Sequence, residues 1–149
     1  MKNFDIEDKF LYFPTLKKRL NILKQQRTRF DSIGELAAAI RADKQVLNPL
    51  LILKVDKRTA VNYVNLVRKA YGGRSNLVGL KKLGDFYYFL IAGERRTRAV
   101  DLLYYGGKRR RSLARIPLKV YSPNTENPDL REILLLQTRE NHTCQTKYS

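Results

Sequence analysis

The chain has 149 residues, a length typical of one domain, and 43% of them are hydrophobic, which is enough to build a core. Its 30 lysines and arginines outnumber 14 aspartates and glutamates, giving a formal net charge of +16 at pH 7. A chain this basic repels copies of itself and attracts polyanions such as nucleic acid, nucleotide phosphates or anionic lipid. One cysteine and one histidine exclude a disulfide framework, a cysteine-rich zinc module and a multi-histidine metal site.

No apolar run approaches the ~20 residues that a membrane-spanning helix needs, and the first residues lack the core of a signal peptide. We therefore expect a cytoplasmic protein with no membrane partner. No internal repeat or low-complexity segment is visible. We expect residues 1–26 to form a basic N-terminal arm and helix, and residues 27–149 to form the domain.

The N-terminal part of the chain predicts an arm and two helices. Residues 1–14 indicate an irregular arm with aromatic anchors. Leu16, Leu20 and Leu23 then recur at helical spacing among basic residues, which predicts a basic amphipathic helix. That helix docks on the domain or, as the less common alternative, meets a membrane. Residues 32–44 predict a second helix, which opens with a capping-box pattern of serine and glutamate.

The middle of the chain alternates apolar runs with helical patterns. Leu50–Val55 predicts a buried strand, and residues 59–71 predict a helix that two glycines end. Phe86–Ile91 is continuously apolar and aromatic, so we expect it to be a central, buried strand. The pattern changes at Gly93 into a helix that extends to Tyr105.

A basic loop follows and leads to the last two elements. Ile116, Leu118 and Val120 alternate with other residues as in a strand, and an Asn-Pro-Asp sequence predicts a helix over residues 127–141. The order of elements indicates an α/β protein, in which strands and helices are mixed along the chain (mixed α+β). We expect a compact domain with a small sheet flanked by helices.

The junction after the second strand carries the candidate site. Gly93 has no Cβ, so an anion can approach the backbone, and the following helix offers unpaired N–H groups and the positive end of its dipole. Arg95, Arg96 and Arg98 add planar guanidinium groups that suit phosphate oxygens. Glu94 either ligates Mg²⁺ or simply favours the start of a helix. The alternative is a solvated basic turn whose arginines pair with nearby acids.

The sequence IAGERRTRA, over Ile91–Ala99, resembles the AGERRxRA box of the ParB N-terminal domain in the ParB/sulfiredoxin-like superfamily. The resemblance extends over residues 27–141. Further segments follow in the order of the family: Arg27–Asp31 with the helix Glu35–Ile40, Asn48–Ile52, Arg115–Val120, and the pair Glu140 and Asn141.

The resemblance implies a ParB/sulfiredoxin-like fold that binds CTP and Mg²⁺ through this GERR box. By position, the nucleotide phosphates would be held by Gly93, Glu94, Arg95, Arg96 and Arg98. The base side would be lined by Asn48 and by Arg29 or Arg27. Catalysis would rest with Glu140 and Asn141, and the metal with Glu94, Glu140 and Asn141. Hard oxygen ligands of this kind are those that Mg²⁺ prefers.

The chain departs from the family pattern at three places. Asn48 stands where glutamine is usual, and His142-Thr143-Cys144 replaces the Gln-Arg that follows the Glu-Asn pair. Residues 56–80 form an insertion with its own helix between two core strands. Because the missing Gln-Arg would order the catalytic corner, we expect a slow CTP hydrolase at most.

The resemblance implies a DNA-associated protein of plasmid or chromosome partition, or of mobile-element regulation, located on the nucleoid or a plasmid. A second copy of the chain is a further expected partner. The expected contacts to the phosphate backbone are Lys108, Arg109, Arg110 and Arg111. Two alternatives stay open. One is a superfamily nuclease or phosphotransferase, and the other is a basic DNA-binding module that has lost nucleotide binding.

Overall fold

The chain alternates strands and helices from its first residues onward. The structure is a computed structural model that describes residues 2–23, 33–43, 48–72, 79–105 and 115–148. In chain order the elements are β1 (Phe4–Tyr12), α1 (Phe13–Arg19), β2 (Leu20–Asn21), α2 (Ile33–Asp43), β3 (Leu50–Val55), α3 (Lys57–Tyr71), β4 (Lys82–Leu83), β5 (Phe86–Ala92), α4 (Glu94–Tyr105), β6 (Arg115–Pro123) and α6 (Arg131–Tyr148).

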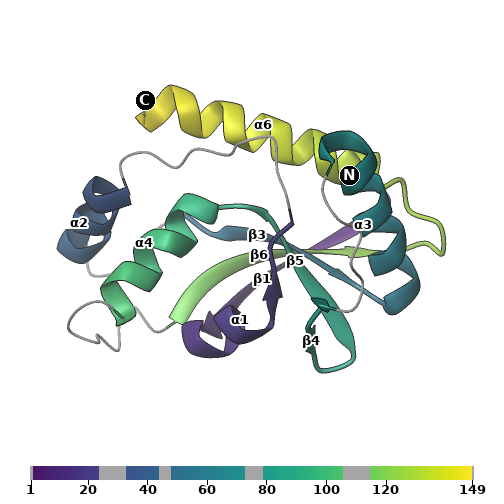
Figure 1. The fold of residues 1–149 in the computed structure, drawn as a ribbon, viewed down its shortest axis with the longest axis horizontal. Helices are drawn as coiled ribbons and strands as arrows, with labels where there is room; N and C mark the ends of the chain where they lie inside the picture. Colours follow the sequence, from purple (N-terminus) through teal and green to yellow (C-terminus); the bar gives the residue numbers. More distant parts are fainter. Residues whose placement is uncertain (1, 24–32, 44–47, 73–78, 106–114, 149) are drawn as a thin grey trace.

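The strands form one mixed sheet with helices on both faces (Figure 1). Within the described residues it is a six-stranded sheet in the order β1-β6-β3-β5-β2, with β4 paired to the outer part of β5. One face packs against α1, α2 and α4, and the other packs against α3 and α6. The chain therefore has the mixed α+β architecture that the sequence predicted.

The two apolar runs of the sequence are adjacent antiparallel strands in this sheet. β3 and β5 pair with each other, and every residue from Tyr88 to Ala92 is buried. Strands covered on both faces have continuous rather than alternating hydrophobic sequences, so both could be located from sequence. The prediction of a buried strand at 86–91 is confirmed for its inner part, while Phe86 at its outer end is exposed.

The N-terminal residues form a strand, so the irregular arm expected for residues 1–14 is wrong. β1 pairs antiparallel with β6 along its whole length, from Phe4 opposite Pro123 to Tyr12 opposite Arg115. Only Phe4 is buried in this edge strand. Apolar residues do recur at even positions of this segment, but three of the four, Ile6, Phe10 and Tyr12, are exposed, as is tolerated on an edge strand with charged neighbours.

The basic amphipathic helix expected to reach Leu23 ends instead at Arg19. Leu20 and Asn21 form β2, and the Asn21 side chain donates to the carbonyls of Lys81 (2.9 Å) and Tyr88 (3.1 Å) and accepts from the Lys81 N–H (2.8 Å). The leucines of this segment pack against the sheet, since Leu16 and Leu20 are buried in the core. In the part of the chain that the structure describes, no helix is long and apolar enough to cross a membrane.

A bulge near the end of β5 connects the sheet to α6. Leu51 and Ile52 of β3 pair with residues on either side of Ile91, which therefore has no partner on β3. The Ile91 carbonyl instead accepts a 2.9 Å hydrogen bond from Nε2 of Gln137, a buried side chain of α6. The Oε1 atom of Gln137 is buried without a hydrogen-bond partner among the described residues. One directional bond thus holds α6 where β5 ends.

We expect Gln137→Met to keep the side-chain volume and to leave the Ile91 carbonyl unpaired. A buried acceptor without a partner costs about 1–3 kcal/mol, and removing the unpaired Oε1 offsets part of that cost. The free energy of unfolding, measured by urea titration, should therefore fall by about 1–2 kcal/mol. Leu135→Met on the exposed side of the same helix is the control and should change it by less than about 0.5 kcal/mol. Equal losses in the two variants would contradict this account.

Candidate functional site

Gly93 shapes the turn that follows β5. Its φ angle is +108°, in the region that L side chains rarely adopt. A Cβ atom at this position would lie 2.6 Å from Cδ2 of Leu50 and 3.0 Å from Nη2 of Arg96. The backbone conformation therefore favours glycine, and the Leu50 side chain would have to shift to admit a Cβ atom.

Helix α4 begins at the residue after Gly93, as the sequence predicted. The Gly93 carbonyl accepts hydrogen bonds from the backbone N–H (2.9 Å) and from the hydroxyl (3.0 Å) of Thr97, which closes the first turn. The first N–H groups of a helix have no intrahelical partner and carry partial positive charge. The end of β5 thus leads directly into a set of hydrogen-bond donors.

Three arginines occupy the first turns of α4 at different depths. Arg95 is buried, with 7% of its surface exposed, whereas Arg96 is partly buried and Arg98 is exposed. All three take part in further interactions within the chain. A buried guanidinium keeps its charge, so it needs negative or polar partners close by. The segment therefore holds positive charge in a fixed position rather than on long mobile side chains alone.

Glu94 is the acidic group of this segment. Burial raises the pKa of its carboxyl group, and the Arg98 guanidinium, 3.5 Å away, partly offsets that rise. The sign of the shift means that the ionised form is disfavoured in the folded protein. A further cation beside this carboxylate would stabilise its charge.

The start of β3 lies next to this junction because β3 and β5 are antiparallel. Asn48 is exposed in the bend that precedes β3, two residues before Leu50, whose side chain lies against Gly93. The fold thus brings Asn48 into the neighbourhood of the predicted phosphate residues. Arg29, its alternative Arg27 and the basic loop at 108–111 lie outside the described residues, so their roles stay predictions.

The expected catalytic pair lies on α6, whose first half packs through Ile133 and Leu134 on the face of the sheet opposite α4. Glu140 is partly buried, and burial first, then the charges of Glu140 and Asp8, raise the pKa of Tyr121. Asn141 belongs to α6, but its side chain lies outside the described residues. Among the side chains that the structure describes, no three of His, Cys, Asp or Glu gather as a metal site would require. The metal role of Glu94, Glu140 and Asn141 stays a prediction.

The sequence analysis did not predict that Gln137 would link helix α6 to strand β5 through a hydrogen bond. The available signal was a polar residue at a core position of α6, four residues after the buried Ile133. A buried amide needs a hydrogen-bond partner, and here the partner is the backbone two residues before Gly93. Gln137 therefore supports the candidate site from the other face of the sheet.

Comparisons with known proteins give one similarity in fold. No family model matches the chain, and no curated protein matches it in sequence. The chain is similar to the solved structure of the C-terminally truncated chromosome-partitioning protein ParB from Caulobacter crescentus complexed with CTP-gamma-S, with 20% identity and a TM-score of 0.47. The match covers 91% of this chain and 52% of the other, so this chain spans about half the length of that structure.

We expect Gly93→Ala to destabilise the fold by about 1–3 kcal/mol through the positive φ angle alone, with a further loss from the contact with Leu50. Thermal and urea unfolding measure this loss. Gly34→Ala is the matched control, because no atom lies within 4 Å of the new Cβ and the residue is exposed in α2. That variant should be neutral or slightly more stable. A stable Gly93→Ala protein would show that the turn relaxes easily.

Proposed function

We propose that the chain binds the triphosphate of CTP, together with Mg²⁺, at the junction between β5 and α4, and that it acts on DNA in plasmid or chromosome partition or in mobile-element regulation. The observation that carries the nucleotide proposal is the geometry at Gly93. The turn is tight, the Arg96 guanidinium lies against it, and the N-terminus of α4 opens beside it. The choice of cytosine follows the resemblance of the GERR box to the ParB N-terminal domain.

A triphosphate needs several fixed positive groups, because phosphoryl oxygens carry most of its charge. Backbone N–H groups at a helix N-terminus provide partial charge, and arginine forks provide bidentate hydrogen bonds. Arg95 and Arg96 are the buried and partly buried members of the set. Arg98, which is exposed and paired with Glu94, suits the rim of the site.

We propose that Glu94 serves the magnesium ion, whose charge would compensate a carboxylate that burial disfavours in its ionised form. Gln137 holds α6 at the end of β5, and Glu140 and Asn141 follow on the next turn of that helix. Figure 1 shows α6 running from the side of α3 toward the side of α2 and α4. This course supports a role for Glu140 and Asn141 at the metal and the attacking water.

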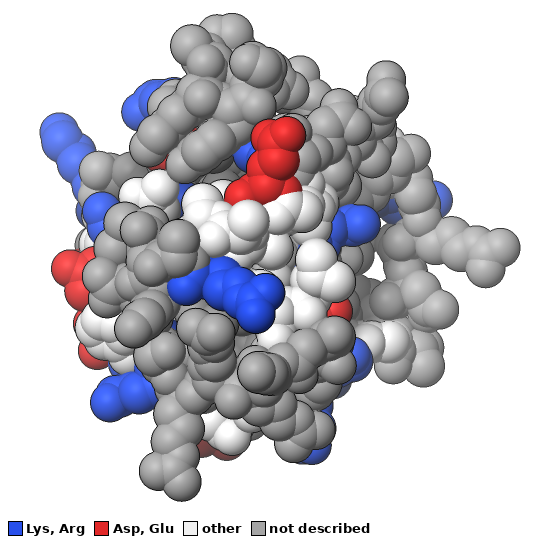
Figure 2. All heavy atoms as spheres, turned by 90° about the vertical axis from the view of Figure 1, so that its left-hand side faces the viewer, with Lys and Arg blue, Asp and Glu red and all other residues white. Residues whose placement is uncertain are grey.

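The proposal of a DNA partner rests on charge. The excess of 16 positive charges is spread widely, and we propose the loop of Lys108, Arg109, Arg110 and Arg111 as one contact to the phosphate backbone. Figure 2 shows the face on the α2 side of the molecule. There the blue side chains stand apart among white and grey ones, so the described residues of this face form no continuous basic patch.

The nucleotide proposal is tested by calorimetry with CTP, ATP and GTP in the presence of Mg²⁺. We expect Arg96→Ala to weaken CTP binding by about ten- to hundredfold, because a charge-assisted contact to phosphate contributes about 1.5–3 kcal/mol. Lys18→Ala, an exposed charge on α1, is the control and should bind as the wild type does. Unchanged CTP binding by Arg96→Ala would contradict the proposed site.

A second experiment separates binding from turnover. Glu140→Gln keeps the shape and hydrogen-bonding capacity of the side chain and removes its charge. We expect this variant to bind CTP within a few-fold of the wild type and to lose phosphate release, which we expect to be slow in the wild type as well. Hydrolysis at the wild-type rate would remove Glu140 from the catalytic role. The controls are heat-inactivated protein and the Arg96→Ala variant.

A further inference from the structure

Helix α3, which forms much of the insertion, has two faces of opposite character. Its inner face is buried against the sheet through Ala60, Tyr63, Val64 and Val67, and the ring of Tyr63 meets that of Phe89 in β5 edge to face at 5.1 Å. The charged residues of α3 are all basic and stand near its two ends: Lys57, Arg58, Arg68 and Lys69. One face of α3 is therefore fixed against the sheet, and the exposed part of the helix carries positive charge.

A single line of polar side chains runs along the outer face of α3. Arg58, Asn62, Asn65 and Lys69 are all exposed and recur at intervals of four, three and four residues. At 100° per residue, these positions fall within about 60° of the helix circumference. We call this line the outer stripe. Its two ends are cationic and its two central members are amides.

The ends of α3 are fixed by caps. The Asp56 carboxylate accepts a 2.8 Å hydrogen bond from the Thr59 N–H, and this bond lowers the pKa of Asp56. At the other end Gly72 adopts a φ of +79°, and its N–H donates to the Arg68 carbonyl at 2.7 Å. Because the helix is anchored at both ends and along one side, the outer stripe is held in a fixed arrangement.

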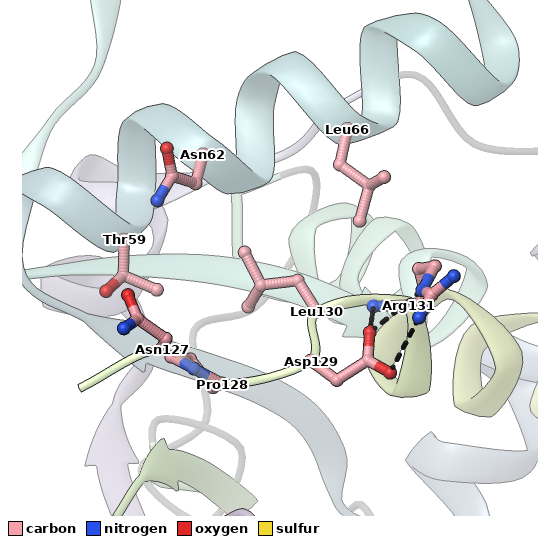
Figure 3. Close-up of a pocket in the computed structure, with 8 residues that line it drawn as sticks. All are labelled: Thr59, Asn62, Leu66, Asn127, Pro128, Asp129, Leu130 and Arg131. Atoms are coloured by element: carbon pink, nitrogen blue, oxygen red, sulfur yellow. Dashed lines mark hydrogen bonds and ion pairs between the residues drawn. The ribbon is translucent and has the colours of Figure 1, made fainter. Parts of the chain in front are cut away.

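One flank of α3 is open. A hollow of about 360 Å³ lies between the helix and the segment Asn127–Arg131, with Asn62 and Leu66 bordering it from α3 (Figure 3). Asp129 borders the opposite side, and the Arg131 guanidinium compensates its charge through hydrogen bonds of 3.0 and 3.3 Å. The flank is therefore accessible, and the acidic group beside it already has a cationic partner.

We propose that α3 is a DNA-reading helix, which enters the major groove of duplex DNA with its outer stripe facing the bases. The major groove, about 12 Å wide, admits an α-helix, and an asparagine amide matches the N6 and N7 atoms of adenine. Arg58 and Lys69 are separated by about 16 Å along the helix axis, so their side chains reach the phosphates that flank the groove. Asn62 and Asn65 lie between them, at the base edges.

The chemistry of the stripe favours duplex DNA over other polyanions. The major groove of A-form RNA is too deep and narrow for a helix, and an anionic membrane surface would require apolar residues among the cations. The outer stripe holds amides where a membrane-bound helix has large apolar side chains. This inference rests on the DNA-binding half of the proposed function and is independent of the nucleotide half.

The probe is duplex DNA selected by the wild-type chain from a random-sequence pool, compared with a scrambled duplex of equal composition by fluorescence anisotropy. We expect R58A/K69A to bind both duplexes at least about tenfold more weakly and to reduce the salt slope by about 2, since each phosphate contact contributes about 0.9. N62A/N65A should keep the salt slope and lose about tenfold or more of its preference for the selected duplex.

The matched control is K18A/R19A, which removes the same charge from exposed positions of α1 on the opposite face of the sheet. Thermal unfolding should be unchanged in all three double variants, because every substituted side chain is exposed. The inference is overturned if R58A/K69A binds as the control does, or if N62A/N65A retains the full sequence preference. Methylation of guanine N7, a major-groove atom, should be blocked by the wild type, and free methylation would also overturn it.

The outcomes separate this inference from the proposed function. If the wild type binds neither duplex, the DNA half of the proposed function fails together with the inference. If the wild type binds and only R109A/R110A/R111A weakens the complex, α3 is not the reader and the proposed function stands. Tight binding to single-stranded RNA or to anionic vesicles through the same stripe, without duplex binding, overturns the inference. R58A/K69A should bind CTP as the wild type does, which calorimetry reads separately.

Discussion

The hydrogen bond from Gln137 to the carbonyl of Ile91 is the contact on which the arrangement of the two helical layers depends. The bulge takes this carbonyl out of the β3–β5 ladder, and a buried backbone acceptor without a partner is expensive. Helix α6 supplies the partner on one face of the sheet. Two residues later the chain turns at Gly93 and α4 leaves on the other face. The end of β5 is therefore the point where both layers are positioned, and the candidate site is built there.

Two basic elements lie on opposite sides of the sheet and differ in how they hold their charge. The arginines of α4 follow a buried strand, and one of them is itself buried, an arrangement suited to a compact, highly charged ligand. The cations of α3 stand outward on an exposed helix face, an arrangement suited to an extended polyanion. Strand β5 touches both, since Phe89 packs on Tyr63 and the same strand leads into Gly93. The same strand therefore borders both basic elements.

The sequence predicted the parts of the fold whose hydrophobic pattern is dictated by burial. β3, β5 and the buried faces of α3 and α4 belong to this class, as does the turn at Gly93. The hydrophobic pattern did not reveal strand β1, in which only Phe4 is buried. It also assigned Leu20 to a helix, although the same leucine fits the buried position of strand β2 equally well. Gln137 lies at a buried position of its helix, but its acceptor arises from a bulge that only the pairing of β3 with β5 creates. Long-range register of this kind has no local signal.

The pairing of β1 with β6 also sets an order of events during synthesis. Residues 4–12 leave the ribosome long before residues 115–123, and β6 is the strand with which β1 pairs in the sheet. At about 5–20 residues per second, β1 waits roughly 6–22 seconds for its partner. Asp5, Glu7 and Asp8 keep the waiting segment charged, which disfavours pairing with strands of other chains. β1 therefore reaches its place in the sheet only after β6 has been made.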